Sequence, residues 1–304
     1  MIKMNRIAPL FVIVAAALWG IDGIILRPAL YGLPVPVVVF VESILITILL
    51  IPVLIRHRSE LSALKRNDWL AFIGVAIFGG VIGTMSITRA LFFVNYVNLS
   101  VVVLIQKLQP VIAILLAAIM LKEKPSKRFF LWAGLAVVGA YLMTFGVHSP
   151  DFAGEMTLEA ALFSLLAVIG FGSSTVFSKR ALRNVSYELG TFLRFALTAL
   201  AMVVVVLVTH NITNIFSINS AQTHIFLLIA LTTGGPAIFL YYYGLKKISA
   251  SVATICELAF PLTAVILEYI IRKNLLDPIQ IVGVAILLYS IFRVTRVKMV
   301  TVSS

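Results

Sequence analysis

Three polar side chains, Gln106, Lys107 and Gln109, lie within four residues of one another near the centre of a long apolar stretch. A charge inside a membrane-spanning helix costs at least about 2.5–3.5 kcal/mol, so such groups are kept facing protein or water. Lysine and glutamine side chains donate hydrogen bonds, and this group could bind an anionic part of a small molecule, such as a carboxylate. Glu257, in another apolar stretch, could face a cationic part of that molecule or take up a proton. One base beside one acid fits an amino acid or a related zwitterion.

A proline follows each of these polar positions at the same spacing. Pro110 lies four residues after Gln106, and Pro261 lies four residues after Glu257. Because a proline removes the hydrogen bond to the carbonyl four residues earlier, each kink is expected to open the carbonyl of Gln106 or Glu257 as a backbone acceptor. Two broken sites near mid-membrane are typical of carriers. The alternative is that the two prolines only shape helix packing.

Other apolar stretches contain further acids and an aromatic residue that could serve the same site. Asp22 and Glu42, together with Glu257, are candidates for a coupling proton, because a carboxyl group removed from water binds a proton more readily. Trp19 lies one turn before Asp22 on the same helix face and is a candidate substrate contact.

Glycines are concentrated in the middle of two apolar stretches, around Gly83 and around Gly235 and Pro236. Small residues permit close helix contact, and either group alone favours that role. Their matching positions also predict a hinge that gates the site.

The other polar and charged residues inside the apolar stretches have simpler interpretations. Arg89 and Arg194 could extend toward the membrane surface, and Tyr241, Tyr242 and Tyr243 are typical of an interfacial aromatic belt. The in-span charges are balanced, with three acids and three bases: Asp22, Glu42, Glu257, Arg89, Lys107 and Arg194. Their alternative role is to pair with one another and hold the protein together.

The composition determines which elements must position these residues. Of 304 residues, 61% are hydrophobic and 12% are charged, against about 25% charged in a soluble domain. A water-soluble enzyme is excluded, and the motifs of intramembrane catalysis, such as His-Glu-x-x-His, are absent. One cysteine, Cys256, and four scattered histidines give no metal-ligand spacing, so neither a metal nor a cofactor is expected.

The apolar runs predict an all-α integral membrane protein with ten transmembrane helices, since only helices and closed barrels satisfy the backbone in lipid. The expected spans are 7–27, 35–55, 69–92, 98–121, 128–147, 158–178, 188–209, 222–246, 249–271 and 277–296.

The basic residues predict the orientation of these spans. The net charge is +12, and 18 of the 24 lysines and arginines fall in the termini and alternate loops. By the positive-inside rule, those segments and both termini are cytoplasmic, in the inner membrane. The charge therefore marks topology, and no nucleic-acid partner is expected. Arg27, Arg272 and Lys273 are assigned to outer segments. A cleavable signal peptide ending near Ala17 is the alternative for the first span.

The two halves of the chain resemble each other at an offset of about 151 residues. Ser100-Val101 matches Ser251-Val252, while Gln106 and Pro110 match Glu257 and Pro261. An odd number of spans per half inverts the second half. We therefore expect two inverted five-helix repeats, 1–149 and 150–304, an arrangement typical of secondary transporters.

The sequence also resembles the EamA type of the drug/metabolite transporter superfamily. The resemblance rests on Leu18-Trp19-Gly20, on the run 99–110 that leads to Leu121-Lys122-Glu123, and on 245–251 leading to Pro261. It implies a ten-helix carrier of small organic solutes, often an exporter, with a central cavity lined by helices other than the fifth and tenth. Glu42 stands where such proteins usually have arginine.

These observations predict an alternating-access secondary transporter of a small polar metabolite, such as an amino acid or a related zwitterion or anion. Its partners are the substrate, the lipid bilayer, and a proton or another coupling ion. A passive channel or a non-transporting membrane protein is the alternative. Oligomeric state, substrate identity and direction of transport do not follow from the sequence.

Overall fold

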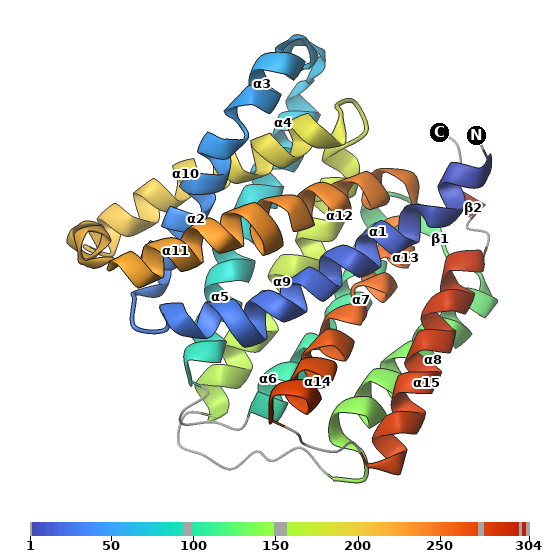
Figure 1. Ribbon diagram of the computed structural model, residues 1–304. Coiled ribbons are helices and arrows are strands. Elements are labelled where there is room, and N and C mark those ends of the chain that lie inside the picture. Colours follow the sequence, from blue (N-terminus) through green and yellow to red (C-terminus); the bar gives the residue numbers. More distant parts are fainter. Residues whose placement is uncertain (1, 94–98, 149–156, 273–276, 298–299, 302–304) are drawn as a thin grey trace.

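The computed structural model describes residues 2–93, 99–148, 157–272, 277–297 and 300–301, and these are almost entirely helical (Figure 1). The first half contains α1 (Ile2–Ile21), η1 (Asp22–Leu26), η2 (Arg27–Leu30), α2 (Val35–Leu49), α3 (Ile51–His57), η3 (Arg58–Ala63), α4 (Arg66–Gly74), η4 (Val75–Gly83), α5 (Thr84–Phe92), α6 (Leu99–Gln106), α7 (Gln109–Met120), β1 (Glu123–Lys124) and α8 (Lys127–Phe145). The second half contains α9 (Thr157–Ala181), α10 (Tyr187–Val208), η6 (Ile212–Ser217), α11 (Ser220–Ile229), η7 (Ala230–Gly234), α12 (Gly235–Lys247), α13 (Ala250–Cys256), α14 (Ala259–Arg272), α15 (Pro278–Arg296) and β2 (Val300–Thr301).

Within these residues, eight helices are long and apolar enough to cross a membrane, and a ninth is a bent pair, Val35–Leu49 and Ile51–Ala63, at 48°. The fourth predicted span is a shorter apolar helix, Leu104–Met120. The predicted multi-pass helical protein is confirmed, while the count of ten and the orientation stay predictions. The division at 149/150 lies outside the described residues.

Local sequence explains where several helices begin. Ser126, Ser186 and Ser249 precede α8, α10 and α13, and each side chain accepts a backbone N–H of the first turn. Asn219 and Asp277 form capping boxes at α11 and α15. These caps satisfy N–H groups that have no partner within the helix.

Two spans break at the positions that the prolines predicted. The fourth span breaks between α6 and α7 at Lys107 and Leu108, and the ninth breaks between α13 and α14 at Glu257 and Leu258. Three other spans contain π-helical segments, η1, η4 and η7. Irregular backbone at membrane depth is tolerated where it lines a cavity or is buried in protein.

The helices α8 and α15 pack side by side at the edge of the molecule (Figure 1). Gly139 and Gly283 let their backbones approach closely: a Cβ atom on Gly139 would lie 2.6 Å from the backbone nitrogen of Leu287. The other helices form a bundle in which α1 contacts α12 and α14, and α9 contacts η4, α5 and α7.

Several predicted cytoplasmic segments meet at the end of the molecule that carries both termini (Figure 1). β1 pairs with β2 in antiparallel register, Glu123 opposite Thr301, a small strand pairing that the sequence did not predict. The Glu123 carboxylate also accepts the backbone N–H groups of Ala250 and Ser251 at 2.8 and 3.0 Å. The segments after the fourth and eighth spans and the C-terminal segment therefore share one end, as the charge pattern predicted.

Candidate functional site

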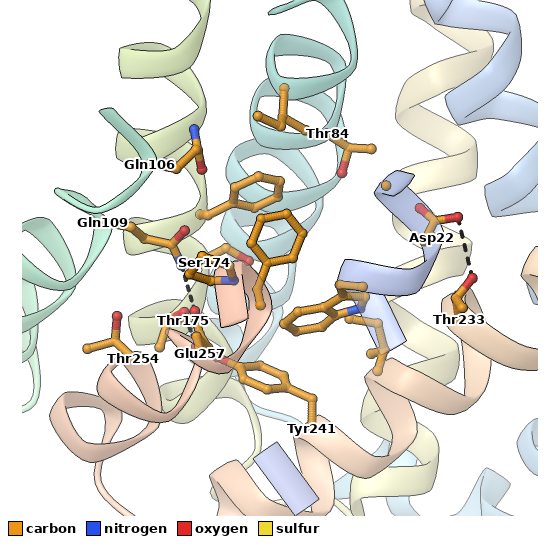
Figure 2. Close-up of a pocket in the computed structure, with 18 of the residues that line it drawn as sticks. Asp22, Thr84, Gln106, Gln109, Ser174, Thr175, Thr233, Tyr241, Thr254 and Glu257 are labelled. Carbon is orange, nitrogen blue, oxygen red and sulfur yellow. Dashed lines mark hydrogen bonds between the residues drawn. The ribbon is translucent and has the colours of Figure 1, made fainter. Parts of the chain in front are cut away.

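A cavity of about 250 Å³ lies in the middle of the bundle (Figure 2). Its walls combine aromatic rings with amide, hydroxyl and charged side chains. The lining residues include Trp19, Asp22, Arg27, Glu42, Thr84, Gln106, Lys107, Gln109, Phe171, Ser174, Thr175, Arg194, Phe195, Thr233, Tyr241, Thr254, Glu257 and Phe260. In the described chain, α8 and α15 contribute no lining residue, as the family resemblance implied.

Glu257 is held by side chains from three other elements. One carboxylate oxygen, Oε2, accepts the amide of Gln109 at 2.5 Å. The other, Oε1, accepts the Tyr241 hydroxyl at 2.7 Å and the Thr175 hydroxyl at 3.3 Å. The Trp19 ring lies 5.3 Å from the ring of Tyr241, centre to centre. The structure therefore brings together three predicted site residues, Gln109, Glu257 and Trp19. We call Gln109, Thr175, Tyr241, Thr254 and Glu257 the glutamate cluster.

Lys107 and Gln106 lie at the break of the fourth span, and both line the cavity. Lys107 is 3% exposed, and its ammonium lies 5.6 Å from the centre of the Phe145 ring. The Gln106 amide donates to the backbone carbonyl of Ser164 at 3.0 Å, which ties α6 to α9.

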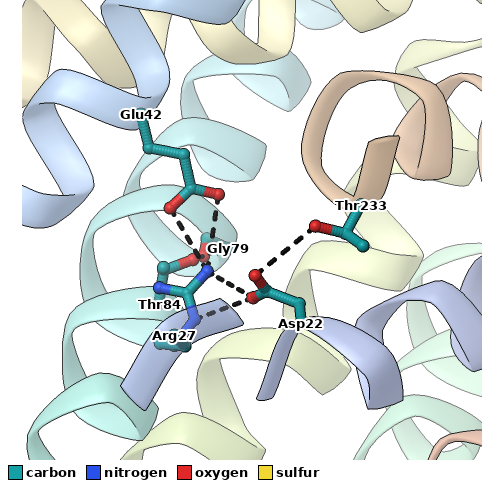
Figure 3. Close-up of polar contacts among 6 residues, drawn as sticks. All are labelled: Asp22, Arg27, Glu42, Gly79, Thr84 and Thr233. Atoms are coloured by element: carbon teal, nitrogen blue, oxygen red, sulfur yellow. Dashed lines mark hydrogen bonds and ion pairs between the residues drawn. The ribbon is translucent and has the colours of Figure 1, made fainter. Parts of the chain in front are cut away.

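A second group of charges centres on Arg27, which the sequence analysis wrongly placed in an outer segment. The first span continues through η1 and η2, so Arg27 is buried at 8% exposure. Its guanidinium lies 2.6 Å from Asp22 and 3.2 Å from Glu42 (Figure 3). Asp22 also accepts the hydroxyl of Thr233 at 3.4 Å, which connects η1 in the first span to η7 in the eighth. We call Asp22, Arg27 and Glu42 the arginine cluster.

The position of Arg27 has a local cause. Residues five apart do not share a face of an α-helix, but η1 is π-helical, and the backbone N–H of Arg27 bonds to the carbonyl of Asp22. The wider turn brings the two side chains together. The available sequence signal was an acid and a base five residues apart at a span end, close to a second unpaired acid, Glu42.

Two further interpretations from the sequence are wrong. Arg194 does not extend to the membrane surface: it lines the cavity, with its guanidinium 3.4 Å from the Ser174 hydroxyl. Tyr241 and Tyr242 are buried, at 3% and 0% exposure, and do not form an interfacial belt. The Tyr242 hydroxyl bonds to that of Ser178 at 2.9 Å. Arg89 is exposed, as expected, with its guanidinium 4.8 Å from the centre of the Phe93 ring.

The expected open acceptor at Pro261 is not present. The carbonyl of Glu257 accepts the backbone N–H of Phe260 at 2.9 Å, because the break forms a tight turn. Of the predicted hinge residues, Gly83 is the last residue of the π-helical segment η4. Gly235 directly follows η7, and Pro236 is the next residue of α12. A Cβ atom on Gly83 would lie 2.9 Å from the Phe171 ring, so close packing operates there.

The described residues include no group of three or more His, Cys, Asp or Glu side chains that could hold a metal ion. The cavity walls offer hydrogen-bonding groups, aromatic rings and charged side chains for recognition of a ligand.

A multi-pass helical bundle with broken helices around a central polar and aromatic cavity is typical of membrane transporters. The sequence pattern of the EamA-like transporter family matches the chain twice, at residues 6–145 and 158–296, and the chain belongs to this family. The riboflavin transporter ImpX of Fusobacterium nucleatum subsp. nucleatum is 43% identical over 291 residues, which cover 95% of this chain and 97% of that protein. A solved crystal structure that is 16% identical superposes with a TM-score of 0.70, over 94% of this chain and 95% of the other, and supports the fold alone.

Proposed function

We propose that this protein is a secondary transporter of riboflavin. The observation that carries the proposal is the 43% identity to a riboflavin transporter over nearly the full length of both proteins. Because the identity extends over nearly the full length of both proteins, we expect the two proteins to share a substrate class.

The chemistry of the cavity is compatible with this substrate. Riboflavin joins a planar, uncharged tricyclic ring to a polyhydroxylated ribityl chain. Aromatic side chains such as Trp19 and Phe171 can contact the ring, and hydroxyl and amide groups can bind the chain. An amino acid is no longer the proposed substrate, because the relative that matches nearly the whole chain is a riboflavin transporter. Riboflavin therefore replaces the zwitterion as the proposed substrate.

Alternating access is proposed to work between the two repeats, 1–149 and 150–304. Each cluster joins the halves: Gln109 bonds to Glu257, and Asp22 to Thr233. Breaking one set of contacts while the other persists would open one side of the cavity at a time. The glycine-rich segments that contain Gly83 and Gly235 would bend during this exchange.

A proton is the proposed coupling ion. The arginine cluster places two carboxylates around one guanidinium, so one carboxylate can take up a proton while the other remains paired. Glu42 is the stronger candidate, because its contact with Arg27 is longer than that of Asp22, 3.2 against 2.6 Å. Glu257 is the second candidate site.

The proposal is tested by uptake of labelled riboflavin into proteoliposomes that contain the purified protein. We expect saturable uptake that unlabelled riboflavin inhibits and a panel of amino acids does not. Uptake inhibited by an amino acid would return the substrate to the zwitterion class, and wild-type rates in both Lys107→Ala and Glu257→Gln would remove the cavity from the mechanism.

A further inference from the structure

Two residues that line the cavity each carry a buried polar group with no hydrogen-bond partner among the described residues. These groups are the hydroxyl of Thr254 and the Nη1 atom of Arg27. Thr254 is 1% exposed and Arg27 is 8% exposed. A buried polar group without a partner costs about 1–3 kcal/mol, so these two atoms indicate where polar atoms of a bound molecule belong.

Thr254, which we included in the glutamate cluster, lines the same cavity as Thr175 and Glu257 (Figure 2). Each carboxylate oxygen can accept two hydrogen bonds. Oε1 of Glu257 accepts from Tyr241 and Thr175, whereas Oε2 accepts only from Gln109 among the described residues. The cluster thus offers a hydroxyl, a carboxylate acceptor and an amide that carries a second N–H.

That pattern of donor, acceptor and donor complements a cyclic imide, in which an N–H lies between two carbonyl groups. The pyrimidine edge of the riboflavin ring is such an imide. The rings of Trp19 and Tyr241, 5.3 Å apart, adjoin the same cluster and provide aromatic surface for a planar ligand.

The arginine cluster has a different chemistry. Arg27 retains the N–H groups of Nη1 as unused donors, while Asp22 and Glu42 can accept further hydrogen bonds. The hydroxyls of Thr84 and Thr233 lie on the same part of the cavity wall (Figure 3). Charged donors and acceptors in close proximity suit a chain of neighbouring hydroxyl groups, each of which donates and accepts.

We propose that the cavity binds its ligand in one orientation, with a cyclic imide edge on Thr254, Glu257 and Gln109 and a polyol chain on Arg27. This rests on the proposed function, since riboflavin carries both groups. Thr254 and Arg27 are then residues that determine specificity, one for the ring and one for the chain.

The test uses quenching of flavin fluorescence by the purified protein, with riboflavin and with lumiflavin, which has the same ring but a methyl group in place of the ribityl chain. Loss of one hydrogen bond in a buried site predicts a weakening of about five- to tenfold. Thr254→Val should weaken both ligands by this factor. Arg27→Lys keeps a positive charge but removes Nη1, and should weaken riboflavin alone.

Thr88→Val is the matched control, because Thr88 is 0% exposed, also has an unpartnered hydroxyl, and lies outside the cavity lining. It should bind both flavins as the wild type does. A third ligand is riboflavin methylated on the imide nitrogen, which should bind wild-type protein more weakly than riboflavin does. The Thr254→Val substitution should reduce the affinity for this methylated ligand by a smaller factor than it reduces the affinity for riboflavin.

The outcomes separate the two proposals. If wild-type protein binds no riboflavin, the proposed function fails. If riboflavin binds but Thr254→Val matches Thr88→Val, or Arg27→Lys weakens lumiflavin as much as riboflavin, the orientation is overturned. Retained lumiflavin binding shows that the Arg27→Lys protein is folded. If the Arg27→Lys protein does not fold, binding of the methylated ligand to wild-type protein still tests the imide contact.

Discussion

Arg27 is the only base shared by two buried carboxylates in the described structure, so replacing it should strongly destabilise the protein. In Arg27→Met the side chains of Asp22 and Glu42, 10% and 13% exposed, lose their common partner. Removing one partner of a buried ion pair costs about 3–5 kcal/mol, because a charge remains without compensation. For a domain of 150–250 residues, each kcal/mol lowers the melting temperature by about 2–4 °C, so we expect a fall of roughly 10 °C.

The two acids should contribute unequally. Asp22 accepts Nε of Arg27 at 2.8 Å and lies 2.6 Å from Nη2, whereas Glu42 contacts only Nη2, at 3.2 Å. Asp22→Asn should therefore lower stability more than Glu42→Gln. The triple variant, with Arg27→Met and both acid substitutions, should regain much of the loss, since replacing a whole buried ion group by neutral side chains is often close to neutral.

Thermal unfolding of detergent-solubilised protein, followed by loss of the monodisperse peak in size-exclusion chromatography, measures these differences. Arg89→Met is the control, because Arg89 is exposed and should change stability by less than about 0.5 kcal/mol. Equal melting temperatures for Arg27→Met and the Arg89→Met control would refute the claim that Arg27 compensates Asp22 and Glu42. A triple variant less stable than Arg27→Met alone would refute it as well.

Three further predictions concern packing, the end of the molecule that carries the termini, and coupling. Gly79→Ala should destabilise the protein by about 1–3 kcal/mol, because the new Cβ atom would lie 2.2 Å from the Ser174 hydroxyl. Gly134→Ala is the control and should not destabilise the protein, because the space around Gly134 is open. Equal melting temperatures for the two variants would contradict close packing at Gly79. Glu123→Gln should lower the free energy of unfolding by about 0.5–2 kcal/mol, because a helix cap is lost. The same thermal unfolding assay measures this change, and an unchanged melting temperature would exclude the capping role. Glu42→Gln should abolish the response of riboflavin uptake to an imposed pH gradient while exchange continues, and a wild-type response would exclude Glu42 as the proton site.

The sequence predicted the helical membrane fold because the apolar runs and the charge pattern reflect simple physical constraints. The breaks at Lys107 and Glu257 were also predictable, since each precedes a proline by three or four residues and proline removes a helix hydrogen bond. Gln109 and Glu257, which contact each other, were both predicted as site residues because they are polar and lie near the prolines of the fourth and ninth spans.

Other features depended on geometry that periodicity does not encode. Arg27 was assigned to an outer segment because the first span ends in π and 3-10 turns that extend beyond its apolar run. Its contact with Asp22 was also missed, because only a π turn brings residues five apart to the same side of a helix. Tyr241 is buried with a partner, Glu257, that lies 16 residues later, at the break of the next span. The strand pairing of Glu123 joins segments nearly 180 residues apart, and no local signal marks it.

Counterflow is the measurement that shows whether this protein carries riboflavin by alternating access. Proteoliposomes loaded with unlabelled riboflavin are diluted into labelled riboflavin, without any ion gradient. A carrier should give transient accumulation of label above the external concentration, and this accumulation should be reduced in Thr254→Val and retained in Thr88→Val. A flux that never exceeds equilibration would indicate a passive channel, and label that enters no faster than in protein-free liposomes would contradict riboflavin transport altogether.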